Sequence, residues 1–334
     1  MASEVTNAFV TYDAIGNRED LTDQIYDISP TDTPFMSGIA RNTASATFHE
    51  WQTDVLAAPT AVGKLEGDAT VRAATVATVR LGNFCQISSR DSTISGTQEK
   101  VNAAGRRSEM AYQMAKRTKE VKRDIETTIL GAQVADAGAV GTARAAAGVN
   151  AWLGTTDGTN TVRGAATGAD PILAAGTPDT AEVAGTTAAT TEAVLNTLLG
   201  AIWNNGGEPS TVMVGSSLKT GMSALRGRVG SRQSVSEDTI LAAAQIYSSD
   251  FGDLRIVPNR FMPLHTVDTT LQEDILILDM QHWSVSYLRS FVRFPLAKIG
   301  DAETNVVLSE FTLESRNELS SGKIADASSI TPAS

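Results

Sequence analysis

The chain has 334 residues, of which 42% are hydrophobic, and its formal net charge at pH 7 is −11. An acidic chain of this kind is a poor candidate for a dedicated nucleic-acid-binding protein, because affinity for phosphates comes from Lys and Arg. The single cysteine, Cys85, excludes an intrachain disulfide, and no run approaches the roughly 18 apolar residues that a membrane-spanning helix needs. We therefore expect a soluble protein, made in the cytoplasm, with Cys85 buried on a strand.

Residues 1–40 are predicted to form an extended arm. Short apolar pairs in this segment are separated by polar residues, and Pro30 and Pro34 keep the residues before them out of the helical conformation. A brief helix over residues 18–27 is compatible with the pattern. The segment has too little apolar surface to fold alone, so we expect it to lie along a larger body.

Residues 45–55 and 76–87 alternate in polarity like the two arms of a β-hairpin. Residues 57–75 between them are rich in Ala, Thr and Gly, contain no aromatic residue and are predicted to form the tip. An isolated two-stranded hairpin is only marginally stable in water, and neither face of the first arm is cleanly apolar. The arms must rest on something else, and a neighbouring copy of the chain is the simplest candidate. This feature favours an assembling protein over a self-contained enzyme.

Residues 103–131 are predicted to form a long amphipathic helix with Gly131 as its C-cap, because apolar residues recur every three to four positions. The apolar positions are Met110, Met114, Val121, Ile125 and Ile129. Basic residues occupy the other faces: Lys116, Arg117, Lys119, Lys122 and Arg123. Two interpretations of this basic face stay open. It contacts nucleic acid weakly, or it is a solvated face paired with acidic residues such as Glu120 and Asp124.

Ala, Gly and Thr dominate residues 132–188, a composition typical of linkers. Trp152 and Leu153 interrupt it and are expected to anchor part of the segment on the body, whereas residues 160–188 are predicted to form a surface loop. Further along, the pattern predicts helices over 191–204, 217–225 and 238–247. Strands are predicted over 211–214, 254–258 and 275–279, and the last 50 residues read as long strands.

No catalytic or metal-binding motif is convincing. The string VGSSLKTG at 214–221 resembles a phosphate-binding loop, but Leu218 stands where the glycine before the lysine should be. The tripeptide Asp250-Phe251-Gly252 has the sequence that binds metal in protein kinases, but the other motifs of those enzymes are missing from this chain. Three scattered histidines and one cysteine cannot form a structural zinc site, and no histidine lies in a nucleophile context. We expect neither enzymatic activity nor a cofactor.

Five strings in order carry a family resemblance. They are TYDAIGNREDLTDQIYDISPTDTPFMSGI, ARAAAGVNAWL, YSSDFGDLRIVPNRFMP, SYLRSFVRFPLAKIGDAE and EFTLESRNELSSGKI. Together with the order arm, hairpin, long helix, tryptophan-anchored loop and mixed body, they resemble the major capsid proteins of tailed bacteriophages. Those proteins have the Johnson-type, lambda-like phage capsid fold, which is of the α+β class.

The resemblance implies a division of the chain. It makes residues 1–43 the N-terminal arm and 44–94 an extended hairpin loop that reaches over a neighbouring subunit. The remaining parts are the peripheral domain at 95–190 with a spine helix at 103–131, a mostly axial domain at 191–280, and strands returning to the peripheral domain with a C-terminal tail at 281–334. Since the sequence starts with a short arm, scaffolding is expected to come from a separate protein or to be unnecessary.

The resemblance also implies a function. Pentamers and hexamers of the chain would assemble into the icosahedral shell of a phage head, enclosing double-stranded DNA that it contacts weakly and without sequence specificity. The expected partners are other copies of itself, a portal, and scaffolding or decoration proteins, with no membrane. The protein would reside in the virion after synthesis in the bacterial cytoplasm. The nearest alternative is the shell of an encapsulating nanocompartment, and more distant ones are a secreted β-rich enzyme or adhesin and a tail or decoration protein.

Candidate contact residues follow from this interpretation. The hairpin would supply inter-subunit contacts through Trp51, Lys64, Glu66, Arg72 and Arg80. The helix would present a basic face to the inner surface through Lys116, Lys119, Lys122 and Arg123. Some relatives join a hairpin-tip lysine covalently to an asparagine of another subunit. Lys64 is the only lysine in the hairpin, so it is either the donor of such a cross-link or an ordinary solvated lysine.

Overall fold

The computed structural model describes residues 27, 29–57, 59, 63, 66–67, 74–101, 103–154, 160–163, 168–225, 245–264, 272 and 274–331. Runs of strands and runs of helices follow one another along the chain, which confirms the expected α+β class. The α-helices are α1 (Pro34–Gly38), α2 (Gly96–Lys100), α3 (Glu109–Leu130), α4 (Val149–Trp152), α5 (Glu192–Asn204) and α6 (Ser216–Ala224). Two 3-10 turns, η1 (Met280–His282) and η2 (Glu318–Ser320), flank the longest strands.

The strands form two main sheets and three two-stranded ribbons. The four-stranded sheet has the order β1 (Ala40–Thr43), β13 (Trp283–Pro295), β14 (Ala302–Ser315) and β4 (Gln86–Ser95). The six-stranded sheet has the order β10 (Ile246–Ser249), β11 (Gly252–Pro258), β9 (Thr211–Val214), β12 (Ile275–Leu278), β15 (Gly322–Ala325) and β5 (Thr161–Arg163). The ribbons pair β2 (Phe48–Thr53) with β3 (Val79–Phe84), β6 (Ile172–Ala174) with β7 (Thr177–Thr180), and β8 (Ala188–Thr191) with β16 (Ala327–Thr331).

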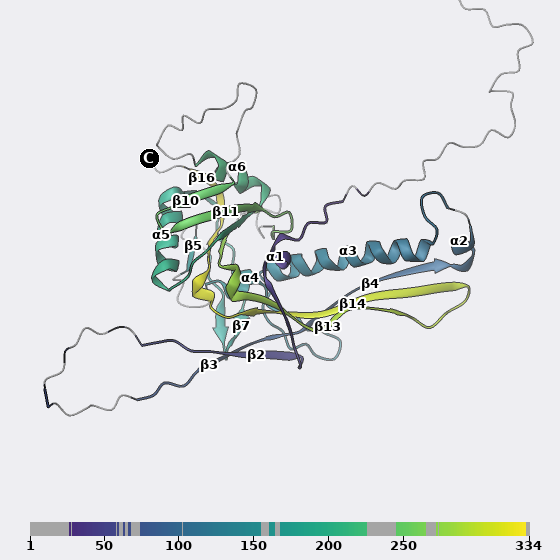
Figure 1. The fold of residues 1–334 in the computed structure, drawn as a ribbon, viewed down its shortest axis with the longest axis horizontal. Coiled ribbons are helices and arrows are strands. Elements are labelled where there is room, and N and C mark those ends of the chain that lie inside the picture. Colours follow the sequence, from purple (N-terminus) through teal and green to yellow (C-terminus); the bar gives the residue numbers. More distant parts are fainter. Residues whose placement is uncertain are drawn as a thin grey trace, which may run out of the picture.

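The long helix α3 runs along one face of the four-stranded sheet (Figure 1). Its predicted apolar face is confirmed, because all five apolar positions are buried in one core cluster with the inner residues of β13 and β14. The helix begins at Glu109, six residues later than expected, because Gly105 has a positive φ of 74° and Ser108 caps the helix by accepting a hydrogen bond from the Ala111 N–H. The core of this half of the molecule is therefore built around the contact between α3 and the four-stranded sheet, to which α1, α4 and strands β9 and β12 add buried residues.

The six-stranded sheet lies beyond the C-terminal end of α3 (Figure 1). It has its own hydrophobic cluster, in which α5 and α6 pack against β9, β12 and β15. The predicted helices at 191–204 and 217–225 and the strands at 211–214, 254–258 and 275–279 are all confirmed, each within two residues. All four residues of β12 are buried, as their unbroken apolar sequence requires. Trp152 and Leu153 are also buried, which confirms the expected anchor.

Two sequence predictions were wrong. The helix expected over 238–247 fails where the structure describes it, because Ile246 and Tyr247 belong to β10 and pair with Arg255 and Leu254. The surface loop expected over 160–188 contains β5, β6, β7 and the first residue of β8. Its composition resembles that of a linker, but charged side chains hold it to the body in addition to the packing of Val162 and Leu173 on the two cores.

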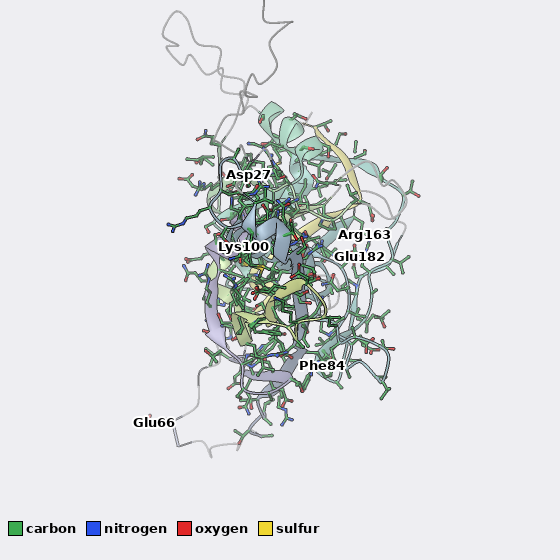
Figure 2. All side chains as sticks on the ribbon, turned by 90° about the vertical axis from the view of Figure 1, so that its right-hand side faces the viewer. Asp27, Glu66, Phe84, Lys100, Arg163 and Glu182 are labelled. Atoms are coloured by element: carbon green, nitrogen blue, oxygen red, sulfur yellow. The ribbon has the colours of Figure 1, made fainter. Side chains whose placement is uncertain are left out.

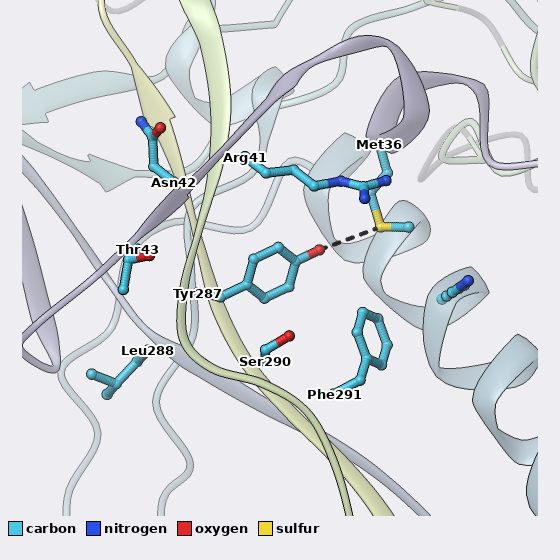
Figure 3. A pocket seen from close by; sticks show the side chains of 9 residues that line it. Met36, Arg41, Asn42, Thr43, Tyr287, Leu288, Ser290 and Phe291 are labelled. Atoms are coloured by element: carbon cyan, nitrogen blue, oxygen red, sulfur yellow. Dashed lines mark hydrogen bonds between the residues drawn. The ribbon is translucent and has the colours of Figure 1, made fainter.

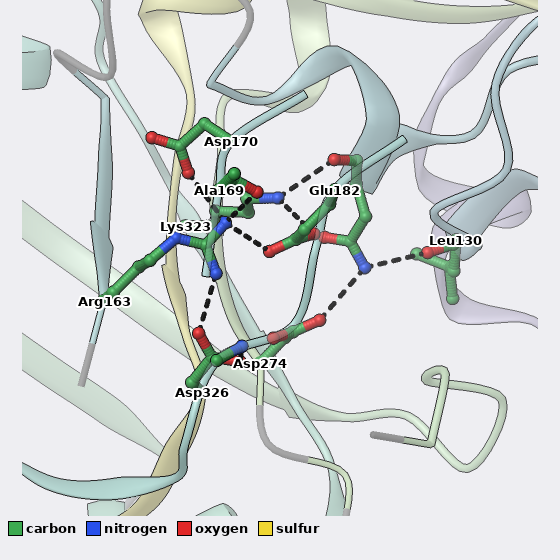
Figure 4. A network of polar contacts seen from close by, with 10 residues as sticks. Leu130, Arg163, Ala169, Asp170, Glu182, Asp274, Lys323 and Asp326 are labelled. Atoms are coloured by element: carbon green, nitrogen blue, oxygen red, sulfur yellow. Dashed lines mark hydrogen bonds and ion pairs between the residues drawn. The ribbon is translucent and has the colours of Figure 1, made fainter. Parts of the chain in front are cut away.

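Those polar side chains form an ion-pair network around Arg163 (Figure 4). The guanidinium contacts carboxylates of Asp326 at 2.7 Å, Asp170 at 2.9 Å and Glu182 at 3.1 Å. Glu182 also pairs at 2.7 Å with Lys323, whose side chain is wholly buried in β15. A buried charge without a partner is costly, so the pair of Glu182 with Lys323 favours the docked position of this segment.

The arm reaches the body through α1, whose N-terminal N–H groups point at a carboxylate on α3. Glu126 is wholly buried and accepts hydrogen bonds of 2.8 Å from the N–H groups of Phe35 and Met36. The side-chain amide of Asn259 donates a third, also of 2.8 Å. Burial raises the pKa of Glu126 against the lowering effect of these hydrogen bonds. One side chain thus joins the arm, the helix and the six-stranded sheet.

The arm continues as β1, which pairs in parallel with β13. An open pocket of about 480 Å³ lies between β1, β13 and α3, and Tyr287 and Phe291 form its apolar side. The Tyr287 hydroxyl lies 3.9 Å from the sulfur of Met36 (Figure 3). The helix predicted over residues 18–27 lies outside the described residues, apart from Asp27. That residue forms a 3.0 Å ion pair with Lys119.

The β2–β3 ribbon leaves the body on the side of the sheet away from α3 (Figure 1). Figure 2 shows Phe84 at the edge of the packed body and Glu66 far from it. The ribbon is anchored at its root by Asn83, which is wholly buried. The Asn83 amide donates to the carbonyls of Ala147 (3.1 Å) and Leu313 (2.8 Å), and its oxygen accepts from the Ala147 N–H at 2.9 Å.

Replacement of Glu126 by its neutral isostere should loosen the arm. In Glu126→Gln the side-chain amide NH₂ faces backbone N–H donors, so at least one buried hydrogen bond is lost. We expect the free energy of unfolding to fall by about 1–3 kcal/mol, measured by urea denaturation of the unassembled subunit. Glu120→Gln on the same helix is the control and should cost less than about 0.5 kcal/mol. Equal effects of the two substitutions would contradict the role assigned to Glu126.

Removal of the Asn83 side chain should destabilise the root of the ribbon by more than the loss of a few side-chain atoms alone would. Asn83→Ala leaves one N–H and two carbonyl groups without their partner in a buried position. We expect a loss of about 2–4 kcal/mol in the same denaturation experiment. Asn204→Ala, at an exposed position near the end of α5, is the matched control and should change stability by less than about 0.5 kcal/mol. A small loss in Asn83→Ala would mean that the ribbon is held by other contacts.

Candidate assembly interface

The β2–β3 ribbon is shorter than the predicted hairpin arms. Its register runs from Phe48 opposite Phe84 to Thr53 opposite Val79. Residue 87, assigned to the second arm, instead belongs to β4, which pairs along its full length with β14 in the four-stranded sheet. The change of partner follows Cys85, whose N–H donates to the Thr47 carbonyl at 2.8 Å. The chain enters the sheet at this point, so the projecting part ends at residue 84.

Within the ribbon, side chains pair across the strands. The Phe48 ring packs on Phe84, with 4.6 Å between centroids, and occupies the space above Gly82 that a side chain would need. Arg80 and Glu50 form a 2.7 Å ion pair on the exposed side. Such an exposed pair adds little to stability. Arg80, a candidate contact residue, is therefore engaged within its own subunit but remains accessible.

Trp51, another candidate contact residue, packs against its own subunit. Its ring lies 5.5 Å from that of the buried Trp152 and 5.9 Å from the ring of His49. From the sequence, Trp51 was expected to lie on a ribbon that packs against a neighbouring copy of the chain. In the subunit, the root of the ribbon rests on the same chain, and Trp51 is half-buried.

The β6–β7 ribbon, from the segment predicted to be a surface loop, contacts the root of the β2–β3 ribbon. The Gly82 N–H donates to the Gly176 carbonyl at 3.0 Å. Gly176 has a φ of 86°, and a side chain at this position would collide with the Arg80 carbonyl oxygen. Only glycine combines this backbone conformation with so close an approach. The β6–β7 ribbon therefore supports the hairpin that projects past it.

Glu314 is the carboxylate where arm, hairpin and sheet meet. It accepts hydrogen bonds from donors on β1, β2 and β13 and from the residue that follows β14. The donors are the Asn42 amide (3.1 Å), the His49 Nε2 (3.4 Å), the hydroxyls of Ser284 (2.9 Å) and Ser286 (3.2 Å), and the Arg316 guanidinium (3.0 Å). Burial alone would raise the pKa of Glu314, but these hydrogen bonds outweigh it and hold the pKa well below its usual range.

No sequence pattern singles out Asn83, Glu126 or Glu314. Each is a polar residue in an alternating or helical pattern, where a solvent-facing position is the ordinary expectation. Their partners lie far away in the sequence, for example 265 residues between His49 and Glu314. Only the three-dimensional arrangement reveals that these polar side chains are buried.

Beyond Thr53 and before Val79, the chain exposes apolar side chains that its own subunit leaves uncovered. Leu56 is 94% exposed, Val55 87% and Val76 85%. Glu66 is exposed as well. The remaining two hairpin candidates, Lys64 and Arg72, lie outside the described residues, so their roles stay predictions. An uncovered apolar edge on a ribbon with one supported end is a surface suited to a protein partner.

Four of the five basic residues on α3 contact an acidic or an aromatic side chain of the same chain: Arg117, Lys119, Lys122 and Arg123. Asp124 binds Arg90 through two hydrogen bonds of 2.7 and 2.9 Å, and Arg117 pairs with Glu120 at 2.6 Å. Among the four candidates, Lys119 pairs with Asp27, whereas Lys116 is exposed. The other two lie over aromatic rings: Lys122 over Phe291 and Arg123 over Phe261. Among the four candidates, Lys119 alone has an acidic partner in the described part of the chain, so both interpretations of the basic face stay predictions.

The described residues offer little chemistry. Cys85 is buried, and burial raises the pKa of its thiol to about 11, so it is protonated at neutral pH and a poor nucleophile. No group of three or more metal-ligating residues comes together in the described part of the chain. Nor does any described helix have the length and apolarity to cross a membrane. The notable features of the molecule are surfaces rather than a reactive site.

The chain is similar to known capsid proteins in both sequence and fold. A family model described as the SU10 major capsid protein matches residues 4–328. The major capsid protein of Escherichia phage Phieco32 is 34% identical over 126 residues. That match covers 37% of this chain and 36% of the relative, so it spans only about a third of the relative's length.

Similar solved structures cover nearly the whole chain at low identity. The capsid of an empty GTA particle has a TM-score of 0.59 at 12% identity, covering 95% of this chain and 98% of the other. The capsid of cyanophage P-SCSP1u has a TM-score of 0.57 at 9% identity, with 99% and 97% covered. The SrpI encapsulin of Synechococcus elongatus PCC 7942 follows at 0.52 and 11%, with 93% and 92% covered. These structures share the phage capsid fold, and the chain belongs to the SU10 major capsid protein family.

Proposed function

We propose that this chain is the major capsid protein of a phage head, assembling through pentamers and hexamers into the icosahedral shell around double-stranded DNA. The observation that carries the proposal is the hairpin, whose root is fixed to its own subunit while Val55, Leu56 and Val76 beyond it are uncovered. Family membership over residues 4–328 supports it. No catalytic function is proposed.

Assembly would proceed by mutual donation of hairpins. Each subunit offers one apolar ribbon and receives another, so weak contacts repeat around closed rings and across the shell. Burying apolar surface drives the contact, at roughly 25 cal/mol per Å². The charge of −11 on each copy opposes it, so added salt should favour assembly by screening. The hairpin candidates Lys64, Glu66, Arg72 and Arg80 would set the register of the contact.

The two hydrophobic clusters support a division into peripheral and axial parts. One cluster joins α3, α4 and the four-stranded sheet and extends to Met213 of β9 and to Leu276 and Leu278 of β12, whereas the other joins α5, α6 and the opposite side of the six-stranded sheet. We assign α3 as the spine helix of the peripheral domain and the segment 191–280 to most of the axial domain. Because β4 pairs with β14, the extended loop is better limited to 44–85 than to 44–94.

We also propose which proteins the shell contacts and where it forms. The shell would join a portal and scaffolding or decoration proteins, and it would form in the bacterial cytoplasm and persist in the virion. A nanocompartment shell is the second candidate, favoured by the likeness to the SrpI encapsulin. Electron microscopy of particles from expressing cells separates the two. Large shells that package DNA support a phage head, and small uniform shells filled with protein support a nanocompartment.

Polar substitution of the uncovered edge tests the mechanism directly. The triple variant Val55→Thr, Leu56→Gln, Val76→Thr changes side chains that are at least 85% exposed, so its melting temperature should stay within about 2 °C of the parent. Shell yield, measured by sedimentation, should fall roughly tenfold or more, because even 1.4 kcal/mol lost per contact changes an equilibrium tenfold.

The control for this variant is Val140→Thr, at another fully exposed valine. It should leave both stability and shell yield unchanged. A second variant that lacks residues 57–75 should still fold but should not close shells. Normal shells from both hairpin variants would refute the proposed role of the hairpin.

A weak DNA contact through the basic face can be measured by its salt dependence. The variant Lys116→Gln, Lys119→Gln, Lys122→Gln should lower the slope of log binding constant against log salt by at most about one per lysine. The control is Lys298→Gln, at an exposed lysine after β13. An unchanged slope in the triple variant would show that α3 does not contact DNA.

A further inference from the structure

The N-terminal half of α3 exposes cations that have no acidic partner among the described residues. Lys116 is exposed on the helix, and Arg107 is exposed just before it. Lys119 is exposed too, and its one acidic partner in the described part of the chain is Asp27 of the arm. We call Arg107, Lys116 and Lys119 the open basic face. Such a face, in a chain that is acidic overall, attracts an anionic segment.

The described part of the arm lies beside α3. The Phe35 N–H binds Glu126, which lies near the C-terminal end of the helix (Figure 1). Eight residues before Phe35 in the arm, Asp27 binds Lys119 at 3.0 Å. The contact has thus moved seven residues toward the start of α3, roughly 10 Å along the helix axis. The arm and the helix therefore run in the same direction, and Lys116 comes next as the arm is followed toward its N-terminus.

The arm residues that precede Asp27 are strongly acidic. Residues 19–27 read EDLTDQIYD and contain four carboxylates and no basic residue. Asp23 stands four positions before Asp27, just as Lys116 stands three positions before Lys119. Eight residues can span up to roughly 26 Å, and the part of α3 before Lys119 is only about 15 Å long. The acidic segment is therefore long enough to reach every cation of the open basic face.

We propose that residues 19–26, which lie outside the described residues, dock on the open basic face of their own subunit and shield it from other polyanions. The pair of Asp27 with Lys119 would be the first of a row of such pairs. The consequence for DNA rests on the proposed function, because a shielded face would contact the packaged genome only after the arm has been displaced.

The attachment of the arm makes weak ion pairs effective. A single exposed pair contributes little to stability. However, Phe35 is buried and Glu126 binds the N–H groups of α1, so the acidic segment is tethered next to α3. A short tether gives an effective concentration on the order of millimolar, which a second copy of the chain in dilute solution does not reach. The tether therefore favours the segment of the same subunit as the occupant.

The charge around Asp27 agrees with this arrangement. A hydrogen bond from Lys119, a second from the Ser29 N–H and the nearby charge of Lys116 lower the pKa of Asp27. One carboxylate of the arm thus already lies in the positive field of two members of the open basic face. The carboxylates that precede it in the sequence would meet the same field.

Zero-length cross-linking of the unassembled subunit tests where the segment lies. A carbodiimide joins a carboxylate to a lysine amine only when the two groups touch, and mass spectrometry identifies the joined residues. The pair of Asp27 with Lys119 is the internal standard. We expect cross-links from Asp20 or Asp23 to Lys116, at least about tenfold above those to the exposed Lys298. Their absence, when the internal standard has formed, would overturn the proposal.

A mixture of subunits labelled with a heavy isotope and unlabelled subunits identifies the occupant. Cross-links confined to chains of one label support docking within the subunit. Cross-links that join a labelled chain to an unlabelled one would show that a second copy supplies the acidic segment, and they would overturn the proposal.

Affinity for a short double-stranded DNA, measured with the unassembled subunit at about 50 mM salt, tests the shielding. The arm variant neutralises three acidic residues: Glu19→Gln, Asp20→Asn and Asp23→Asn. The matched control makes the same change of net charge at exposed positions outside α3 and the arm: Glu66→Gln, Glu208→Gln and Asp250→Asn. We expect affinity to rise roughly fivefold or more in the arm variant and less than about twofold in the control.

A gain in the arm variant should also depend on the face that the segment covers. Adding Lys116→Gln and Lys119→Gln to the arm variant should remove most of the gain, as the two sets of charges act on one another. Equal gains in the arm variant and its control, or no gain in the arm variant, would overturn the shielding. Because only free subunits are used, failure here leaves the proposed shell function untouched.

Discussion

Burial of a polar side chain is favourable only when its hydrogen bonds are satisfied, and this constraint holds the accessory segments of the molecule in place. The arm, the hairpin and the segment around Arg163 each have too little apolar surface for a core. A buried polar residue stands at each junction with the body, in addition to apolar contacts such as that of Phe35: Glu126 for the arm, Asn83 for the hairpin, and Lys323 for the third segment. Such anchors are directional, so they fix orientation as well as contact.

The two ends of the hairpin differ in what their side chains contact. Near the root, Asn83, Trp51 and Gly82 are bound to the subunit itself. Farther out, the side chains of Val55 and Leu56 are almost fully exposed. This division explains why neither face of the first arm is cleanly apolar. Half of the pattern serves contacts within the subunit, and the other half is left for a partner.

The sequence predicted what depends on apolar periodicity and missed what depends on distant polar partners. Helix α3, helix α5 and the buried strand β12 follow from spacing alone, and the family resemblance ordered them into the correct fold. The strands within 160–188 were not predicted, because few apolar residues mark them and ion pairs supply much of their attachment to the body. The Glu314 junction could not be predicted, since its donors come from segments separated by up to 272 residues. The basic face of α3 was foreseen as a pattern, but its actual partners were not.

Cys85 gives this arrangement a practical consequence. It is the only cysteine, and it lies at the point where the chain passes from the ribbon into the sheet. Its thiol is shielded by burial and kept protonated, so alkylating reagents reach a reactive thiolate only when that junction opens. The native chain therefore carries its own chemical reporter. The rate at which a maleimide modifies it, in free subunits and in closed particles, would record how often the hairpin detaches from its base.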